Sequence, residues 1–573
     1  MEPVTEYGPT VPSCNDLHAS KYRLSNESFE ECMARISLHM SDDEEHFNEL
    51  KEIFLNMRFM PAGRIQSAMG SPRDVTAYNC FVSGSIEDSM QSIMEKATQA
   101  AETMRRGGGI GYDFSNIRPS GDRIVSLDSS ASGPVSFMHI YDAICRTIVS
   151  AGHRRGAMMG VLRVDHPDIE EFIRAKRNTT DLTNFNISIG VTDEFMNAVT
   201  NKTEFALRFD GKDYKHIDAS ALWDEIMRAN WDWAEPGVLF IDRINEENPL
   251  YYCEEITATN PCDEQPLPPF GACLLGSFNL VKYVSPQRVG SNIKFRFNFF
   301  QFEQDIPVVV NAMDNVIDRT NYPLSEQKEE AESKRRMGLG ITGLGNALTL
   351  MDMKYGEPNT LKFIRKLMRT LTYESYHASS DRAVMHGSFP LFDKDKYLDG
   401  KFISRFPEAL KEKIKKQGMR NSHLISIAPT GTISFCADNI SSGLEPVFSH
   451  ELTRTVNTEF GPINILLKDY VYSNHKIKGE TTEDLTTDSH LNTQIACQPY
   501  VDSAISKTIN VGENVTFLEF KDIYTKAWKG KLKGVTTFRL SGKRYGILNK
   551  VESSETEGTA CYFDPDTGQK ECA

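Results

Sequence analysis

The sequence lacks several features that would place it in large functional classes. It has no uninterrupted apolar run long enough to span a membrane, and its start, MEPVTEYGPTVPSC, has neither basic residues nor an apolar core. It also lacks an excess of basic residues, because the formal net charge is −15 and binding a nucleic-acid backbone requires a basic face. We therefore expect a soluble cytoplasmic protein that binds neither membranes nor nucleic acids. A local pocket can still bind a small anion.

Cysteine is present but is not arranged as in secreted or zinc-binding domains. The 11 cysteines are spread over the chain, their number is odd, and no CxxC pair occurs. Most should therefore be reduced, any disulfide should be catalytic, and no metal site is expected. Hydrophobic residues make up 40% and charged residues 25%, which excludes a disordered, collagen-like or coiled-coil protein.

The order of patterns along the chain predicts one large α/β domain with an appendage at each end. Residues 29–57 place apolar positions among charges and predict helices. From about Thr76, short apolar runs such as CFVSG, VLRVD, NISIGV and VLFID alternate with helical stretches, which is typical of parallel βα architecture. After Arg544 the chain is polar and poor in aliphatic residues. We divide it into a helical region (1–75), a catalytic domain (76–545) and a flexible tail (546–573).

The stretch Thr257–Leu280, TATNPCDEQPLPPFGACLLGSFNL, carries the most informative chemistry. Asn260, Cys262 and Glu264 stand at i, i+2 and i+4, so an extended chain would point an amide, a thiol and a carboxylate to one face. Pro261 and the Pro268–Pro269 pair exclude a helix and predict a shaped loop. On spacing alone, a proline-rich connector with one buried cysteine is an equal alternative.

Two further segments suggest phosphate binding. Pro429–Ser434, PTGTIS, offers three hydroxyls and a glycine, which could hold phosphates at a helix N-terminus, although a plain turn is the alternative. Gly338–Gly343 fits GxGxxG, but it follows a charged helical stretch and not a strand, so we reject a dinucleotide site there.

The motif NPCxEQPLPPxGxCxLGSxNL resembles the active-site loop of the ribonucleotide reductase catalytic subunit, and its QPLP form is most similar to the adenosylcobalamin-dependent branch. The resemblance extends to these further segments: Tyr78–Val82, Gly107–Gly121, Arg154–Ile173, Leu182–Ile189 and Ala428–Ser434. It implies a ten-stranded α/β barrel that converts ribonucleotides, more readily diphosphates than triphosphates, to 2′-deoxyribonucleotides. The implied cofactor is adenosylcobalamin.

The resemblance also assigns catalytic roles. Cys262 would form the thiyl radical, Glu264 would act as general base on the 3′-hydroxyl, and Asn260 would hold the ribose hydroxyls. Cys80 and Cys273 would supply two electrons by closing to a disulfide, the alternative being two buried apolar cysteines. Asp263 departs from the family, which often has glycine there. Because Asp tolerates left-handed backbone, the loop should keep its geometry.

Binding and regulatory residues follow in the same way. The resemblance places these residues at the substrate: Asn79, Gly109, Pro429, Thr430, Gly431, Thr432, Ile433 and Ser434. Asp88 and Arg118 would bind deoxynucleotide effectors, although Asp88 could equally cap a helix. The loop Ala175–Asn186 would relay effector identity, and a homodimer is implied. Because the N-terminal region is short and lacks the pattern of the family's additional ATP-binding domain, we expect on–off control by ATP and dATP to be missing.

The end of the chain bears on the reductant and the radical source. Cys561 and Cys572 resemble a tail pair that shuttles electrons from thioredoxin or glutaredoxin, unless they are incidental thiols. Thr536, Thr537 and Phe538 stand where a metal-dependent enzyme carries a tyrosine pair, which favours cobalamin. The alternatives are a large subunit that needs a separate metal radical subunit and an inactive nucleotide-sensing relative.

Overall fold

The computed structural model describes residues 7–150, 154–155, 157–177, 181–290, 292–458, 461–539, 561–563 and 570–572. The chain opens with helices, as predicted for residues 29–57. These are α1 (Pro12–Tyr22), α2 (Phe29–Met40) and α3 (Glu44–Leu55). Ser28 and Glu31 form a capping box at α2, which satisfies amides that the first helical turn leaves unpaired. β1 (Phe59–Pro61) and α4 (Gly63–Ala68) lead into the barrel.

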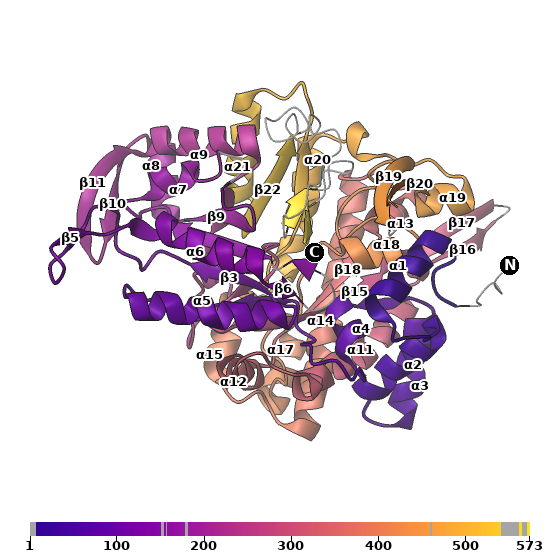
Figure 1. Ribbon diagram of the computed structural model, residues 1–573. Helices are drawn as coiled ribbons and strands as arrows, with labels where there is room; N and C mark the ends of the chain where they lie inside the picture. The colour runs from indigo at the N-terminus through magenta and orange to yellow at the C-terminus, as the bar shows by residue number, and fades with distance from the viewer. Residues whose placement is uncertain are drawn as a thin grey trace.

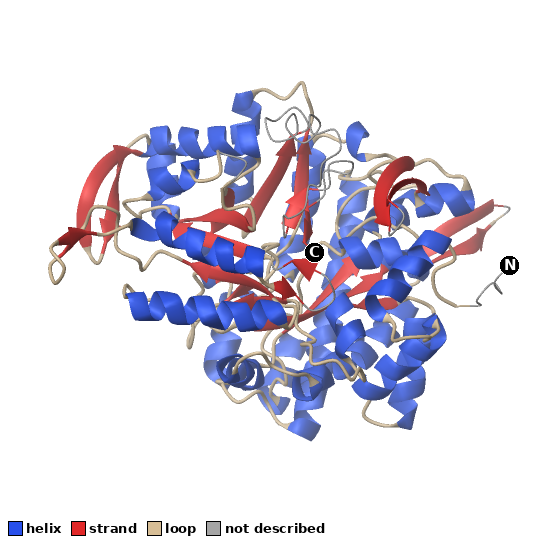
Figure 2. Ribbon diagram, in the orientation of Figure 1, coloured by secondary structure: helices blue, strands red, loops and turns tan. Residues whose placement is uncertain are grey.

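Five parallel strands form the first half of the barrel. They are β2 (Cys80–Val82), β3 (Gly109–Asp113), β8 (Met158–Arg163), β9 (Phe185–Val191) and β12 (Gly237–Phe240). The intervening helices are α5 (Met90–Arg105), α6 (Gly133–Thr147), α7 (Ile169–Arg174), α8 (Asp193–Asn201) and α9 (Ala219–Trp233). Strands of the sheet are buried between helices, as Figure 2 shows, and their near-continuous apolar sequences reflect burial on both faces.

The second half runs antiparallel to the first and closes the ring. It contains β15 (Ala272–Asn279), β18 (Met337–Thr342), the segment 425–427, β21 (Thr508–Val511) and β22 (Gly534–Arg539). Isolated bridges Leu339–Ile425 and Ile427–Ile505 join the segment 425–427 to its neighbours on both sides. The halves meet where β15 pairs with β2 and where β12 pairs with β22, both antiparallel. The ten-stranded barrel predicted from the sequence is therefore confirmed, with β1 added outside β15.

The remaining helices cover the barrel or extend from it (Figure 1). They are α10 (Ile241–Glu246), η1 (Leu280–Tyr283), α11 (Phe299–Arg319), α12 (Ser325–Lys334), α13 (Leu344–Leu350), α14 (Pro358–His386), α15 (Lys394–Asp399), α16 (Lys401–Ser404), α17 (Glu408–Gln417), α18 (Gly431–Cys436), α19 (Tyr470–His475), η2 (Thr482–Asp484), α20 (Thr487–Cys497), η3 (Gln498–Tyr500) and α21 (Phe517–Lys529). No helix among the described residues is long and apolar enough to cross a membrane.

Short two-stranded hairpins stand apart from the ten-stranded sheet. Most of them are built from β4 (Arg123–Ile124), β5 (Ser129–Ser130), β6 (Val149–Ser150), β7 (Arg154–Arg155), β10 (Glu204–Phe209), β11 (Lys212–Asp218), β16 (Val284–Val289), β17 (Asn292–Phe297), β19 (Glu451–Thr458), β20 (Gly461–Lys468), β23 (Cys561–Phe563) and β24 (Lys570–Cys572). The hairpin of β13 (Ala258–Thr259) and β14 (Pro266–Leu267) carries the predicted catalytic residues.

A buried ion cluster ties the covering helices to the second half of the barrel. The carboxylate of Asp314 on α11 accepts hydrogen bonds from Arg335, Arg382 and Arg420 at 2.9, 2.7 and 3.1 Å. Asn421 donates a further bond at 2.8 Å. Arg335 precedes β18 and Arg420 precedes the segment 425–427, so one carboxylate fixes the entry to two adjacent barrel strands.

Candidate active site

The β13–β14 hairpin ends in a tight turn that gathers the predicted catalytic side chains. The amide of Asp263 donates to the carbonyl of Asn260 at 3.1 Å, and Asn260 N donates to the carbonyl of Gln265 at 3.1 Å. Asp263 has a φ of 67°, the left-handed conformation that we expected Asp to tolerate there. The loop predicted from the prolines is present, but the extended conformation that the spacing argument assumed for Asn260–Glu264 is not. The turn at Asp263, and not strand alternation, brings the amide, thiol and carboxylate together.

A glycine on β3 makes room for this hairpin. A Cβ atom at Gly111 would lie 1.8 Å from the backbone carbonyl oxygen of Thr259, far inside van der Waals contact. Gly111 has no positive φ, so its absent side chain, and not backbone freedom, is what the site requires. The same strand holds Gly109, whose Cβ would lie 3.3 Å from Pro261. The glycines of the GGGIG run (107–111) therefore leave the space that the catalytic hairpin occupies.

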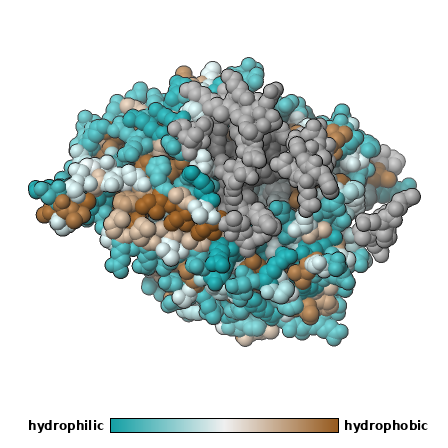
Figure 3. Space-filling view, viewed as in Figure 1, coloured by the Kyte–Doolittle hydropathy of each residue, from teal (hydrophilic) through white to brown (hydrophobic). Residues whose placement is uncertain are grey.

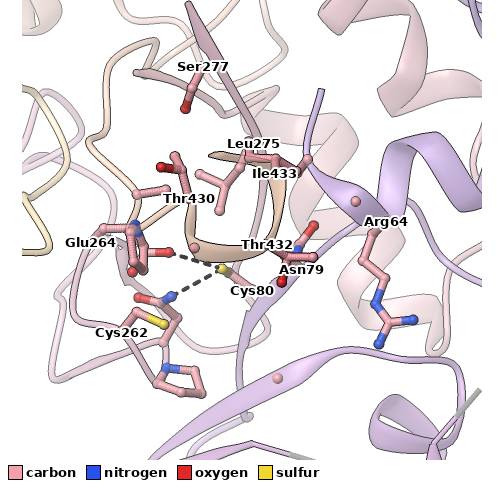
Figure 4. Close-up of a pocket in the computed structure, with 18 of the residues that line it drawn as sticks. Arg64, Asn79, Cys80, Cys262, Glu264, Leu275, Ser277, Thr430, Thr432 and Ile433 are labelled. Atoms are coloured by element: carbon pink, nitrogen blue, oxygen red, sulfur yellow. Dashed lines mark hydrogen bonds between the residues drawn. The ribbon is translucent and has the colours of Figure 1, made fainter. Parts of the chain in front are cut away.

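Two thiols lie on facing strands beside the hairpin tip. Cys80 on β2 stands directly opposite Cys273 on β15, so both side chains point to the same face of the sheet. Cys80 Sγ lies 3.6 Å from Oε1 of Glu264 and accepts a hydrogen bond of 3.1 Å from Nδ2 of Asn260 (Figure 4). Asn260 thus contacts a cysteine of the predicted redox pair. No disulfide joins Cys80 and Cys273 in the structure.

Burial sets the protonation of the two thiols. Desolvation raises the pKa of Cys80 well above its ordinary value, and the nearby Glu264 carboxylate raises it further. Desolvation likewise raises the pKa of Cys273. Both cysteines are therefore protonated at neutral pH. Each can supply a proton together with an electron.

A pocket opens over these residues. Cys262, Asn260, Glu264 and Cys80 line it, together with the predicted substrate residues Asn79, Gly109, Pro429, Thr430, Gly431, Thr432 and Ile433. The predicted phosphate segment forms the N-terminus of α18, where first-turn amides have no partner within the helix. Ser434 does not line this pocket, because its hydroxyl bonds to Gly431 O and Ser442 Oγ. Cys273 does not line the pocket either.

Comparison with known proteins decides the family. Residues 78–538 match the barrel domain of ribonucleotide reductase. The chain belongs to the ribonucleotide reductase family. It is 35% identical over 526 residues to a vitamin B12-dependent ribonucleoside-diphosphate reductase of Mycobacterium tuberculosis, covering 87% of this chain and 72% of that protein. A protein of the same name from Thermoplasma acidophilum is 33% identical over 563 residues, covering 93% and 69%.

Sequence reasoning missed the contribution of the N-terminal region to the pocket of this ribonucleotide reductase. Tyr22, Ala62, Gly63 and Arg64 line it from α1 and the β1–α4 connection. These residues belong to no motif that would have marked them. Leu275, Gly276 and Ser277 also line it and do fall within the long motif around Cys262. Their place on β15 beside the hairpin explains why the motif extends so far.

The predicted effector residues pair with each other. Arg118 Nε donates to Oδ2 of Asp88 at 2.6 Å, and the amide of Arg118 donates to Oδ1 at 3.2 Å. The alternative that Asp88 caps a helix is wrong, because Ser89 caps α5 by accepting from Ser92 N. The pair therefore stands at the start of α5, and the chain leaving that helix reaches the pocket at Gly107.

The glycines of Gly338–Gly343 do not form a phosphate-binding turn. Gly338 and Gly340 lie within the buried strand β18, and a Cβ on either would meet Ser426 at under 3 Å. Their missing side chains allow β18 to pack closely against the segment 425–427.

The segment where a metal-dependent enzyme carries a tyrosine pair lies on β22. Its Thr537 hydroxyl forms hydrogen bonds with Tyr524 and Asn230, and neither of these residues lines the pocket.

Most of the predicted tail lies outside the described residues, and so do residues 178–180 of the predicted relay loop. Within the tail, β23 and β24 pair antiparallel and place Cys561 opposite Cys572. The two predicted shuttle cysteines are thus neighbours across a two-stranded ladder.

Proposed function

We propose that this ribonucleotide reductase converts ribonucleoside diphosphates to 2′-deoxyribonucleoside diphosphates, with adenosylcobalamin as its radical source. The observation that carries the proposal is the hairpin tip, where Cys262, Glu264 and Asn260 line one pocket beside the Cys80–Cys273 pair. Relatives named vitamin B12-dependent ribonucleoside-diphosphate reductase support both the substrate and the cofactor.

The residues divide the reaction among themselves. A thiyl radical on Cys262 takes the 3′-hydrogen of the ribose, leaving a carbon radical and restoring the thiol. Glu264 accepts the 3′-hydroxyl proton, which helps the 2′-hydroxyl to leave. Cys80 and Cys273 then give up two protons and two electrons and form a disulfide: one proton leaves with the 2′-hydroxyl as water, and the other proton with both electrons makes the new C–H bond at C2′. Cys262 finally returns the hydrogen atom to C3′ and becomes a thiyl radical again, while Glu264 gives the proton back to the 3′-hydroxyl. The raised pKa values of both thiols suit this role, because protonated thiols can give hydrogen as well as electrons.

Asn260 positions the first of these thiols. Its amide donates to Cys80 Sγ at 3.1 Å while its carbonyl oxygen accepts the amide of Gln265 at 2.9 Å. The same side chain therefore both stabilises the hairpin turn and orients Cys80. Contact with the ribose hydroxyls, which the resemblance implies, would add to this role.

The residues around Cys262 fit a radical source that reaches the thiol directly. Tyr22 is the one aromatic residue among the described side chains that line the pocket, so no tyrosine chain leads to Cys262 there. Ala157 and Pro261, small neighbours of the hairpin tip, would border the reactive end of the cofactor. When bound, adenosylcobalamin supplies a carbon-centred radical by homolysis of its Co–C bond.

The oxidised pair must be reduced again after each turnover. Cys561 and Cys572 would carry electrons to it from a thioredoxin- or glutaredoxin-type protein by thiol exchange. The pairing of their strands keeps the two cysteines at one site. The cytoplasm, which keeps thiols reduced, is the compartment that this chemistry requires.

Regulation and assembly would use the face around α5. Asp88 and Arg118 would bind a deoxynucleotide that selects the base to be reduced. Met90 and Met94 on α5 are 59% and 43% exposed, and Figure 3 shows apolar surface gathered over α5 and α6. Exposed methionines on a helix face suit contact with a second copy, so we include a homodimer in the proposal.

The test is deoxynucleotide formation by the purified chain alone. With CDP, adenosylcobalamin and a small dithiol, chromatography should show dCDP, and Cys262→Ser should reduce turnover below about one per cent of wild type because a serine alkoxyl radical is not accessible. Activity that appears only with a metal-loaded partner protein would contradict the cofactor. No activity under any of these conditions would favour an inactive nucleotide-sensing relative.

A further inference from the structure

The pocket holds one positive and one negative side chain among its described residues. Arg64 and Glu264 are the charged members of the lining, which is otherwise built from glycine and from apolar or uncharged polar residues. Figure 4 places them on opposite sides of Cys80, with Asn79 and Thr432 between Cys80 and Arg64. A ligand that spans the pocket therefore meets a carboxylate at one end and a guanidinium at the other.

Arg64 is held in place before any ligand arrives. The residue is 8% exposed, and it is the second residue of α4, shortly after the buried strand β1. The guanidinium packs on Gly107, where a Cβ atom would lie 2.4 Å from Nη1. Gly107 has a φ of 99°, so only glycine fits comfortably at this position. A preorganised guanidinium loses little freedom on binding an anion.

The phosphate segment alone offers little charge to a substrate. Two of its three hydroxyls bond within the protein: Thr430 Oγ1 contacts Thr342 Oγ1 at 2.9 Å and accepts Gly443 N at 2.7 Å, and Ser434 faces Ser442. Thr432 lines the pocket, and α18 begins there at Gly431. A helix end provides about half a positive charge, which is less than a diphosphate carries.

We propose that Arg64 binds the diphosphate of the substrate and so makes the pocket selective for nucleotides over nucleosides. The inference rests on the proposed function, because it takes Glu264 and Cys262 as the ribose end. The opposite end must then receive the phosphates or the base. A fixed guanidinium suits the phosphates, since these are the same in every substrate and match its geometry with paired hydrogen bonds.

The experiment compares binding of CDP and of cytidine by calorimetry to wild type, Arg64→Gln and Arg64→Lys. Arg73→Gln serves as the matched control, because Arg73 is an exposed arginine of the same region outside the pocket. Arg64→Gln should weaken CDP binding by about tenfold to 100-fold, as expected for losing a charge-assisted hydrogen bond, with cytidine binding unchanged. Arg64→Lys should fall between, and Arg73→Gln should match wild type.

Each outcome decides the assignment. Equal losses for CDP and cytidine, or CDP binding within twofold of wild type in Arg64→Gln, would overturn it. If circular dichroism shows that Arg64→Gln does not fold, the ratio of CDP affinity to cytidine affinity in Arg64→Lys decides instead. A ratio equal to that of wild type would then contradict the assignment of Arg64. If wild type binds no ribonucleotide, the proposed function and this inference both fail. If wild type binds CDP, the proposed function stands and the variants test the role of Arg64 alone.

Discussion

Gly111→Ala should disable the enzyme without removing any catalytic side chain. The new Cβ would lie 1.8 Å from the carbonyl oxygen of Thr259, so the hairpin must move by about 1.5 Å to reach ordinary contact. Thr259 directly precedes the turn that carries Cys262 and Glu264. A misplacement of about 1 Å can lower a rate about 100-fold, so we expect at least that loss in kcat. Overpacking should cost about 1–3 kcal/mol of stability.

The assay is dCDP formation at saturating CDP, with thermal unfolding measured on the same samples. Gly190→Ala is the matched control, since Gly190 lies on barrel strand β9 of the same sheet, has no positive φ and would place its Cβ 3.8 Å from the nearest atom. It should keep activity within about twofold, because ordinary packing leaves the hairpin in place. A folded Gly111→Ala enzyme that retained more than about a tenth of wild-type turnover would refute the reasoning that this contact positions the catalytic residues.

Three further predictions follow from other parts of the molecule. Replacing Cys561 and Cys572 with Ser should stop turnover driven by thioredoxin but spare turnover driven by a small dithiol; equal loss with both reductants would exclude a shuttle. The Asp314 carboxylate, among three arginines, has a pKa lowered to about 2, so it should add about 2 kcal/mol of stability that is lost as pH falls from about 4 to 2. In Asp314→Asn, the free energy of unfolding should depend less on pH between about pH 4 and 2, and it should be about 3–5 kcal/mol lower than that of wild type at neutral pH. Asp88→Asn should abolish the change in base preference caused by dTTP, dATP or dGTP, and unchanged regulation in that variant would remove Asp88 from the effector site.

The sequence and its resemblance to a family predicted the barrel and named candidate catalytic residues, but not how these residues come together. Alternating apolar runs and helices indicate parallel βα architecture whatever the exact register of the strands, and the family resemblance implied that these strands form a ten-stranded barrel. The turn at Asp263 was not, because one left-handed residue changes the direction of the chain while leaving the spacing of Asn260, Cys262 and Glu264 intact. Spacing alone therefore suggested a strand where the structure has a turn.

Contacts between distant segments were also beyond sequence reasoning. Arg64 reaches the pocket because β1 pairs with β15, and no local pattern encodes that pairing. Similarly, Ser89 and not Asp88 caps α5, since the carboxylate of Asp88 is engaged by Arg118, 30 residues along the chain. Local preference made either residue acceptable as a cap, and a tertiary contact decided between them.

The most direct test of the account is a kinetic isotope effect at C3′ of the ribose. Its central claim is that the hairpin presents Cys262 to take the 3′-hydrogen. In competition with unlabelled CDP, CDP deuterated at C3′ should be reduced more slowly, whereas CDP deuterated at C5′ should be reduced at the same rate. Equal rates for the C3′-deuterated and unlabelled substrates would contradict the assignment of Cys262 to hydrogen abstraction at that carbon.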